Sequence, residues 1–219
     1  MIAGKLVTDT IVPLRTSDTG ETALGIMSDF YVRHLPIVNN EQLLGLISED
    51  DILEHDVNEP VGSYELSIRR PQVKYNDHLY EIMRQLSEHQ LTVIPVVDVE
   101  GNYVGMVTQE DVLNYFARLA SFSDPGTILV LEVPSRDYSL AEICRLIEGE
   151  DTRVLSAFVS NNSDGTVLNV TLKLNRSYIQ RVLATLDRFS YVVIASFNEQ
   201  ELYETLQDNY NSLMYYLDV

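Results

Sequence analysis

The 219-residue sequence is poor in several residue types, and each shortage excludes a class of protein. It has one cysteine, so neither an intrachain disulfide framework nor a thiolate metal cluster can form. Its four histidines show no pairing at metal-ligand spacing, which disfavours a metal site. Basic residues number 15 against 33 acidic ones, giving a net charge of −18. This balance disfavours nucleic acid and anionic membranes as partners, because Lys and Arg supply most of that affinity.

Long hydrophobic runs are also missing. No apolar run approaches the ~20 residues that a membrane-spanning helix needs. The N-terminus lacks the basic start and apolar core of a signal peptide. We therefore expect a cytoplasmic protein without membrane contact. Its 45% hydrophobic content and its length fit one large or two modest domains.

The first half of the chain contains an internal repeat. With an offset of 59 residues, 14–38 falls on 73–97, and LPIV at 35–38 falls on IPVV at 94–97. After a one-residue shift, GLISEDDIL at 45–53 falls on GMVTQEDVL at 105–113. Each copy, of about 50 residues, is too small to bury a sheet alone. We therefore expect the two copies to pack together as a pair.

Each copy is predicted to fold as β-α-β-β-α. In copy one, Asp18 with Glu21 indicates a helix start, and apolar residues follow at helical spacing. Two short strands joined by a polar turn then lead to a second helix. This helix is expected to begin at Ser48, with Ile52 and Leu53 on its apolar side.

The second half is predicted to be a ferredoxin-like βαββαβ unit. Its strands are expected at 127–133, 154–159, 167–174 and 191–197. A capping box, Ser139-x-x-Glu142, opens the first helix, and an apolar face marks the second. From Asn198 a final amphipathic helix is predicted. Its apolar stripe, which either packs on its own sheet or forms a dimer seam, consists of Leu202, Leu206, Tyr210, Leu213 and Leu217.

The predicted fold class is therefore α+β with two modules. Turn-forming residues at 57–63 and 121–126 mark the connectors. The expected parts are repeat one at 1–57, the linker and repeat two at 58–122, the βαββαβ unit at 127–197 and the C-terminal helix at 198–219.

Both copies carry one motif after a glycine-led strand. Its members are Gly45, Ser48 and Asp51 in copy one, and Gly105, Thr108 and Asp111 in copy two. Helix capping accounts for such a pair and contributes ~1 kcal/mol. Recurrence at the same place in a repeat, beside a proline-containing strand, favours a binding role. A strand-to-helix turn with a hydroxyl and exposed N–H groups is a natural phosphate seat.

These residues resemble a tandem pair of cystathionine β-synthase (CBS) domains, a Bateman module, over about residues 5–120. The resemblance implies a cleft that binds an adenosine-containing regulatory ligand such as AMP, ATP or S-adenosylmethionine, with no required cofactor. By that likeness Asp51 and Asp111 hold ribose hydroxyls, and Ser48 and Thr108 hold a phosphate. The residues that would frame the adenine are His34, Leu35, Pro36, Val93, Ile94 and Pro95.

Residues 127–197 resemble an ACT domain. The segment VPSRDYSLAEI at 133–143 is similar to that family's first strand-to-helix turn, which usually carries a glycine where amino-acid effectors bind. Tyr138 stands at this position, and its ring would fill the space of the effector. The CBS-then-ACT order is similar to that of small stand-alone regulatory proteins, some of them linked to acetoin utilisation.

The number of acidic residues at the start of the motif helix differs between the two copies. The motif helices begin with Glu49, Asp50 and Asp51 in copy one and with Gln109, Glu110 and Asp111 in copy two. Unless these acids are only solvated helix starts, copy two should tolerate a phosphate better. Residues 1–126 hold 20 acidic and 8 basic residues, a net charge of −12, which favours compact or screened adenosyl ligands over a bare triphosphate. Arg15 and Lys74 are either phosphate neighbours or exposed strand-edge charges.

We expect a non-catalytic regulatory protein that binds an adenosyl ligand and signals, as a homodimer, to an unidentified protein partner. The sequence shows no nucleophile-base pair and no P-loop. Three alternatives stay open: a scaffold whose motifs are only helix caps, an amino-acid-responsive ACT regulator, and an enzyme of unknown type.

Overall fold

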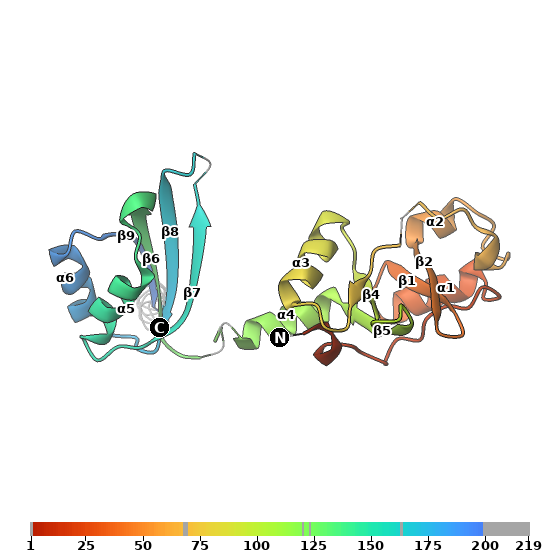
Figure 1. The fold of residues 1–219 in the computed structure, drawn as a ribbon, viewed down its shortest axis with the longest axis horizontal. Coiled ribbons are helices and arrows are strands. Elements are labelled where there is room, and N and C mark those ends of the chain that lie inside the picture. Colours follow the sequence, from red (N-terminus) through yellow and green to blue (C-terminus); the bar gives the residue numbers. More distant parts are fainter. Residues whose placement is uncertain (1, 68–69, 120, 123, 163, 199–219) are drawn as a thin grey trace, which may run out of the picture. The chain divides into compact units, whose positions relative to one another are not determined.

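The computed structural model describes residues 2–67, 70–119, 121–122, 124–162 and 164–198 (Figure 1). The chain divides into two compact units, Met1–Phe116 and Ala117–Val219. The first unit contains the two repeats, and the second contains the segment predicted as βαββαβ. Among the described residues, no helix has the length and apolar character required to cross a membrane.

The first unit consists of two similar sets of elements. Copy one contains η1 (Ala3–Lys5), α1 (Gly20–Asp29), β1 (His34–Asn39), β2 (Gln42–Ser48) and α2 (Glu49–Leu53). After η2 (Val61–Ser63), copy two contains β3 (Val73–Lys74), α3 (Leu79–Glu88), β4 (Val93–Val97), β5 (Tyr103–Thr108) and α4 (Gln109–Leu119). The strands form a two-stranded sheet, β1-β2, and a three-stranded sheet, β3-β4-β5.

The predicted β-α-β-β-α order is observed in full only in copy two. In copy one the first strand is reduced to a single parallel bridge between Leu14 and Ile37. The prediction for α2 holds for Ile52, which is buried, but is wrong for Leu53, which is 63% exposed. The physical reason is length, because α2 spans 5 residues and ends at Leu53.

The prediction that Asp18 starts the first helix is wrong. Thr19 is the N-cap of α1, and its hydroxyl accepts a backbone N–H of the first turn at 3.3 Å. The Asp18 carboxylate instead accepts the Arg15 N–H at 2.7 Å. Asp77 accepts the Lys74 N–H at 2.8 Å in the same way. Both aspartates therefore close the turn that precedes a helix.

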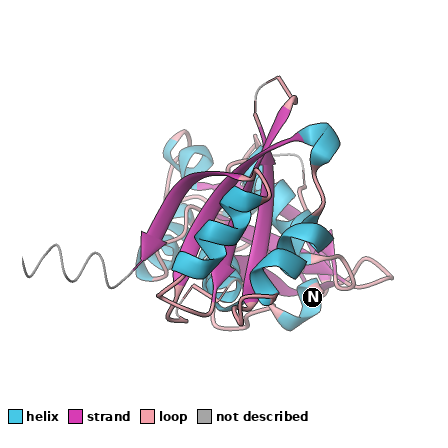
Figure 2. Ribbon diagram, turned by 90° about the vertical axis from the view of Figure 1, so that its left-hand side faces the viewer, coloured by secondary structure: helices cyan, strands magenta, loops and turns pink. Residues whose placement is uncertain are grey.

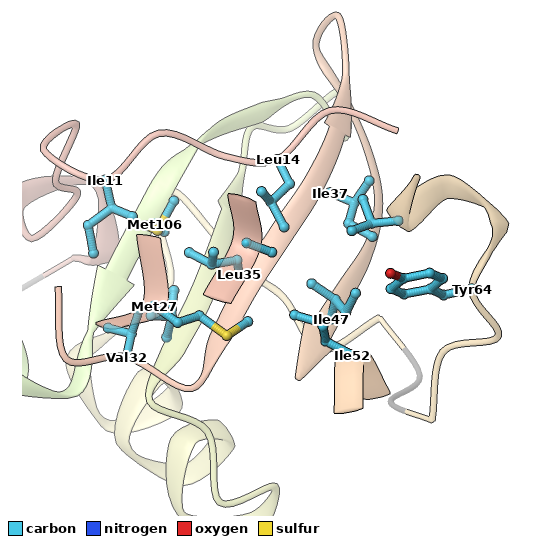
Figure 3. Close-up of a cluster of buried hydrophobic side chains, with 13 residues drawn as sticks. Ile11, Leu14, Met27, Val32, Leu35, Ile37, Ile47, Ile52, Tyr64 and Met106 are labelled. Carbon is cyan, nitrogen blue, oxygen red and sulfur yellow. The ribbon is translucent and has the colours of Figure 1, made fainter. Parts of the chain in front are cut away.

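Each repeat completes the hydrophobic core of the other. Met106 of β5 and Val93 of β4 belong to the core of copy one, and Leu46 of β2 belongs to the core of copy two. Figure 3 shows Met106 beside Ile11 in the core of copy one. Leu46 and Met106 are equivalent in the repeat, and both are 0% exposed. Because burying one such side chain contributes ~1.5–3 kcal/mol, each copy depends on its neighbour.

The segments that precede the two copies are exchanged in the same manner. The Ala3 N–H donates to the Asp77 carbonyl of copy two, and the Val61 N–H donates to the Asp18 carbonyl of copy one, both at 2.8 Å. Ala3 and Val61 are buried in those same cores. The N-terminal arm then continues along β5, where the Thr8 N–H donates to a strand carbonyl at 2.9 Å. Residues of this arm are thereby held beside the copy-two motif.

The second unit is a four-stranded antiparallel sheet covered on one face by two helices. Its elements are β6 (Thr127–Pro134), η3 (Ser135–Asp137), α5 (Leu140–Glu148), β7 (Val154–Asn161), β8 (Val167–Leu174), α6 (Gln180–Arg188) and β9 (Val192–Asn198). The strand order is β7-β8-β6-β9. Figure 2 views this unit from its helical side. One hydrophobic cluster joins α5 and α6 to the inner residues of β6 and β8.

The βαββαβ element order expected for the second unit is observed. Ser139 caps α5 as predicted, with its hydroxyl accepting the Glu142 N–H at 3.3 Å. Asn198, predicted to start the final helix, is the last residue of β9. The rest of that predicted helix, 199–219, lies outside the described residues.

The equivalent glycines Gly105 and Gly45 predict unequal effects of substitution. A Cβ at Gly105 would lie 2.4 Å from Val7 Cγ1, and a Cβ at Gly45 would lie 2.6 Å from Leu66 Cδ1. A β-branched valine is stiff at χ1, whereas the end of a leucine side chain can turn away. Urea denaturation should show that Gly105→Ala lowers the free energy of unfolding by ~1–3 kcal/mol and Gly45→Ala by less. Equal losses would contradict a close fit of Val7 on β5.

Candidate functional site

A cavity of about 700 Å³ opens in the first unit beside the copy-two motif. Its volume lies within the ~300–1,000 Å³ range of small-molecule sites. The wall is supplied by the N-terminal arm, the residues 30–32 that follow α1, the second half of α3, and α4 from its start to Phe116. Both repeats therefore contribute to this cavity.

The polar lining of the cavity consists of hydroxyl, amide and carboxylate groups. Its Thr and Ser residues are Thr8, Thr10, Ser87, Thr92 and Thr108. Gln109, Glu110 and Asp111 add one amide and two carboxylates. These lining residues, all of them described by the structure, include no lysine, arginine or histidine. The cavity can therefore hydrogen-bond a neutral polar ligand but offers no cation to an anion.

The apolar lining offers flat surfaces of the kind that contact a nucleobase. Phe30, Tyr31 and Phe116 are its aromatic members, and Val32 and Leu86 are among its aliphatic ones. Tyr31 follows α1 with φ of 53° and is 94% exposed. Aromatic faces beside hydroxyls suit a ligand with one planar apolar part and one polar part.

Thr108 and Asp111 hold each other at the start of α4. The Thr108 hydroxyl donates to Asp111 Oδ2 at 2.6 Å, and the Asp111 N–H donates back to that hydroxyl at 3.0 Å. The Thr108 N–H also donates to Oδ2, at 3.2 Å. Within the described part of the chain, no group donates to Asp111 Oδ1. One carboxylate oxygen thus stays available at the cavity.

Ser48 and Asp51 form the corresponding box in copy one, but both carboxylate oxygens are engaged. Oδ2 accepts the Ser48 hydroxyl at 2.7 Å and the Ser48 N–H at 2.9 Å, and Oδ1 accepts the Ser67 N–H at 3.1 Å. Asp51 is 3% exposed. Burial acts to raise the pKa of Asp51, but hydrogen bonds from Ser67 and Ser48 outweigh it and hold that pKa below its ordinary value. Neither Ser48 nor Asp51 lines the cavity.

The linker segment Tyr64–Ser67 covers the copy-one motif. The Tyr64 ring stacks on His55 with centroids 4.5 Å apart, and its hydroxyl donates to the Asp56 carbonyl at 2.7 Å. Leu66 packs against the core of copy one. The N-terminal arm, by contrast, bonds to β5 and leaves an open cavity at the copy-two motif. The two motifs therefore have the same local geometry and different surroundings.

The residues expected to frame an adenine are buried, and none of them lines the cavity. They are His34, Leu35, Pro36, Val93, Ile94 and Pro95. Leu35 and Ile94 are 0% exposed and belong to the two cores. The cavity instead uses Val32 and Thr92, just before β1 and β4. Arg15 and Lys74, considered as phosphate neighbours, do not line it either.

Sequence reasoning missed the contribution of the N-terminal arm. Thr8 and Thr10 precede the aligned part of the repeat, which begins at residue 14. A signal was present, because the offset of 59 places Thr8 on Ser67, so a hydroxyl residue occurs there in both copies. Extending the alignment upstream would have revealed an arm in front of each copy.

His34 joins the two copies beside the cavity. The Thr92 N–H donates to His34 Nδ1 at 3.2 Å, and the Arg33 N–H donates to the Thr92 hydroxyl at 2.8 Å. Because Nδ1 accepts a backbone N–H, the ring is neutral, with its proton on Nε2. Burial, followed by the Arg33 guanidinium, lowers the pKa of His34. Acid is therefore expected to weaken this link.

His34 predicts a loss of stability in mild acid. Its ordinary pKa is 6.5, and the folded value is lower. The unfolded chain consequently binds a proton that the folded chain does not, so this contribution is full above pH 6.5 and declines below it. His34→Gln should flatten the pH dependence of the unfolding free energy from about pH 7.5 to 5.5. The wild-type chain is the reference, and an unchanged slope in His34→Gln would contradict the assignment.

Asp51 predicts a structural penalty larger than that of Asp111. Asp51→Asn places an amide NH2 among groups that already donate, so it should lower the free energy of unfolding by ~1–3 kcal/mol. Asp111→Asn should cost less, because Asp111 is half-buried with one engaged oxygen. The Asp51 contribution is full above its ordinary pKa of 3.8 and is lost as pH falls through the lower folded value. Urea denaturation of both variants tests this, and the reverse order would refute it.

Comparison with known proteins gives matches to the repeat region. The sequence profile described as the CBS domain matches residues 3–58 and 63–118. The magnesium transporter MgtE of Thermus thermophilus is 30% identical over 148 residues, which cover 64% of this chain and 32% of that protein. The chain spans less than half the length of three curated relatives that it matches.

Two solved structures are similar over about half of this chain. A CBS domain pair/ACT domain protein from Thermotoga maritima is 24% identical with a TM-score of 0.49, covering 54% of this chain and 98% of that one. An acetoin utilization protein from Vibrio cholerae is 23% identical with a TM-score of 0.48, covering 56% and 95%. With two adjacent profile matches that fall on its two repeats and together span half of its sequence, the chain belongs to the CBS domain family.

Proposed function

We propose that this is a non-catalytic regulatory protein that binds one adenosine-containing ligand in the copy-two cavity. The observation that carries the proposal is the cavity itself, which brings Thr108 and Asp111 together with residues of copy one. The CBS relationship implies AMP, ATP or S-adenosylmethionine as candidates, with no required cofactor.

In this proposal each part of the ligand meets a matching group. Asp111 Oδ1, to which no described residue donates, accepts the ribose hydroxyls. The 5′ substituent lies toward Thr108 at the start of α4. Phe30 and Tyr31 provide aromatic surface for the adenine.

Ser48 and Asp51, which the resemblance also assigns to a ligand, have a structural role in this proposal. The Ser67 N–H occupies the Asp51 oxygen that would otherwise meet a ribose. The linker would have to leave before a second ligand could bind. We therefore assign one ligand to each chain.

The proposal extends to the whole chain, with repeats at 1–57 and 58–122, an ACT-like domain at 127–197 and a C-terminal segment after β9, which ends at Asn198. Support for the ACT-like domain comes from its element order and the β7-β8-β6-β9 sheet, which match a ferredoxin-like fold. Tyr138 packs against the core of this unit, which argues against an amino-acid effector there. In this proposal the ACT-like domain passes the ligand signal through a homodimer to a protein partner. Such coupling requires a ligand that binds two conformational states of the protein with different affinities.

A scaffold without any ligand is the second candidate. The observation that favours it is the complete capping box of Ser48 and Asp51, because local hydrogen bonds account for that motif in full. Helix capping does not account for the cavity beside the copy-two motif.

Calorimetric titration and thermal denaturation of the full chain separate these candidates. With adenosine, AMP, ATP and S-adenosylmethionine as probes, we expect one site per chain and a stabilisation of ~2.7 kcal/mol at 100 times Kd. Asp111→Asn should weaken binding at least ~10-fold, or ~1.4 kcal/mol, and more than Asp51→Asn does. No binding of any probe would favour the scaffold. A stronger loss from Asp51→Asn, or two sites per chain, would refute the assignment to copy two.

A further inference from the structure

We propose that the cavity selects its ligand by charge. It takes an adenosine-bearing molecule whose 5′ substituent is neutral or cationic, such as a sulfonium, and it rejects 5′-phosphates that carry no divalent cation. This inference rests on the proposed function, because it assumes that the cavity binds an adenosine group.

The ionisable side chains that line the cavity are all acidic. Glu110 and Asp111 are its ionisable carboxylates, and the lining holds no basic side chain to offset them. Asp111 is half-buried, so its charge is screened less than in bulk water, and Glu110, although exposed, lies beside it in the first turn of α4. A phosphate beside α4 would therefore meet repulsion, whereas a cation would be attracted.

The equivalent place in copy one contains a basic residue. There, Arg33 Nε donates to Glu49 at 3.0 Å, and its guanidinium lies 3.4 Å from Asp50. The offset of 59 places Thr92, a neutral residue, at the position of Arg33. Among the described residues, Glu110 has no ion-pair partner. Arg33 therefore offsets one of the three acidic charges of copy one, so copy two loses the advantage for a phosphate that its smaller number of acids predicted. In copy two both acids, Glu110 and Asp111, line the cavity.

The N-terminus of α4, the kind of place where a phosphate is usually held, already has protein acceptors for part of its backbone N–H groups. The Gln109 N–H donates to the Thr92 carbonyl at 2.9 Å. The Asp111 N–H donates to the Thr108 hydroxyl at 3.0 Å. Two of the first backbone donors of α4 are therefore taken by the protein, and fewer are left for an anion.

A ligand series at low ionic strength tests this selection by calorimetry. Adenosine and S-adenosylmethionine should bind the full chain at least tenfold more tightly than AMP without a divalent cation. Addition of Mg²⁺ should narrow that ratio for AMP and ATP, because the metal offsets phosphate charge. High salt should also narrow it, through screening.

Variants at equivalent positions of the two copies supply the control. Glu110→Gln should narrow the ratio of adenosine to AMP affinity, and Glu110→Lys should invert it. Asp50→Asn changes the equivalent residue of copy one, which lies outside the cavity and beside Arg33, and should leave the ratio unchanged.

The outcomes separate this inference from the function on which it rests. If metal-free AMP binds as tightly as adenosine, or if Glu110→Lys leaves the ratio unchanged, selection by charge is refuted while adenosine binding stands. If adenosine and every other probe fail to bind, the proposed function is refuted together with this inference.

Discussion

The reciprocal exchange of apolar side chains and arms between the repeats is the constraint on which the rest of the first unit depends. Leu46 completes the core of copy two, and Met106 completes the core of copy one. The backbone repeats this exchange through Ala3 and Val61, each bonded to the other copy at 2.8 Å. A copy of about 50 residues cannot bury enough surface by itself, so the pair is the folding unit. Any site between the motifs is consequently a product of both copies.

Two nearly symmetric motifs acquire different chemistry because their neighbours differ. The segment before copy two covers Asp51, because the Ser67 N–H donates to its carboxylate. The segment before copy one instead bonds to β5 and leaves Asp111 at an open cavity. Arg33 forms ion pairs with Glu49 and Asp50 in copy one, and its equivalent in copy two is the neutral Thr92. Repetition thus provides a stable frame, and a few substitutions within it leave one motif covered by the linker and the other beside an open cavity.

The sequence carried most of the fold but only part of the site. Hydrophobic period and turn residues are local signals, so the repeat, the motif caps and the βαββαβ order could be predicted. The helix start at Asp18 failed because two neighbouring residues, Asp18 and Thr19, can each cap a turn. The cavity wall could not be foreseen, since it depends on where distant arms cross. Ile94, next to the strand proline, is buried in the core of copy two, and the packing of the structure shows this where the sequence motif does not.

The position of the copy-two motif within α4 explains how a ligand could act beyond its own cavity. The helix starts at the motif and continues to Leu119, past Phe116, where the first unit ends. Glu110 and Asp111 occupy its first turn, and Phe116, further along, also lines the cavity. A ligand that offsets the acidic first turn therefore changes the electrostatic energy of the element that leads into the second unit. For the proposed regulatory role, such a ligand has to bind two arrangements of α4 with different affinities, because only differential binding shifts an equilibrium between states.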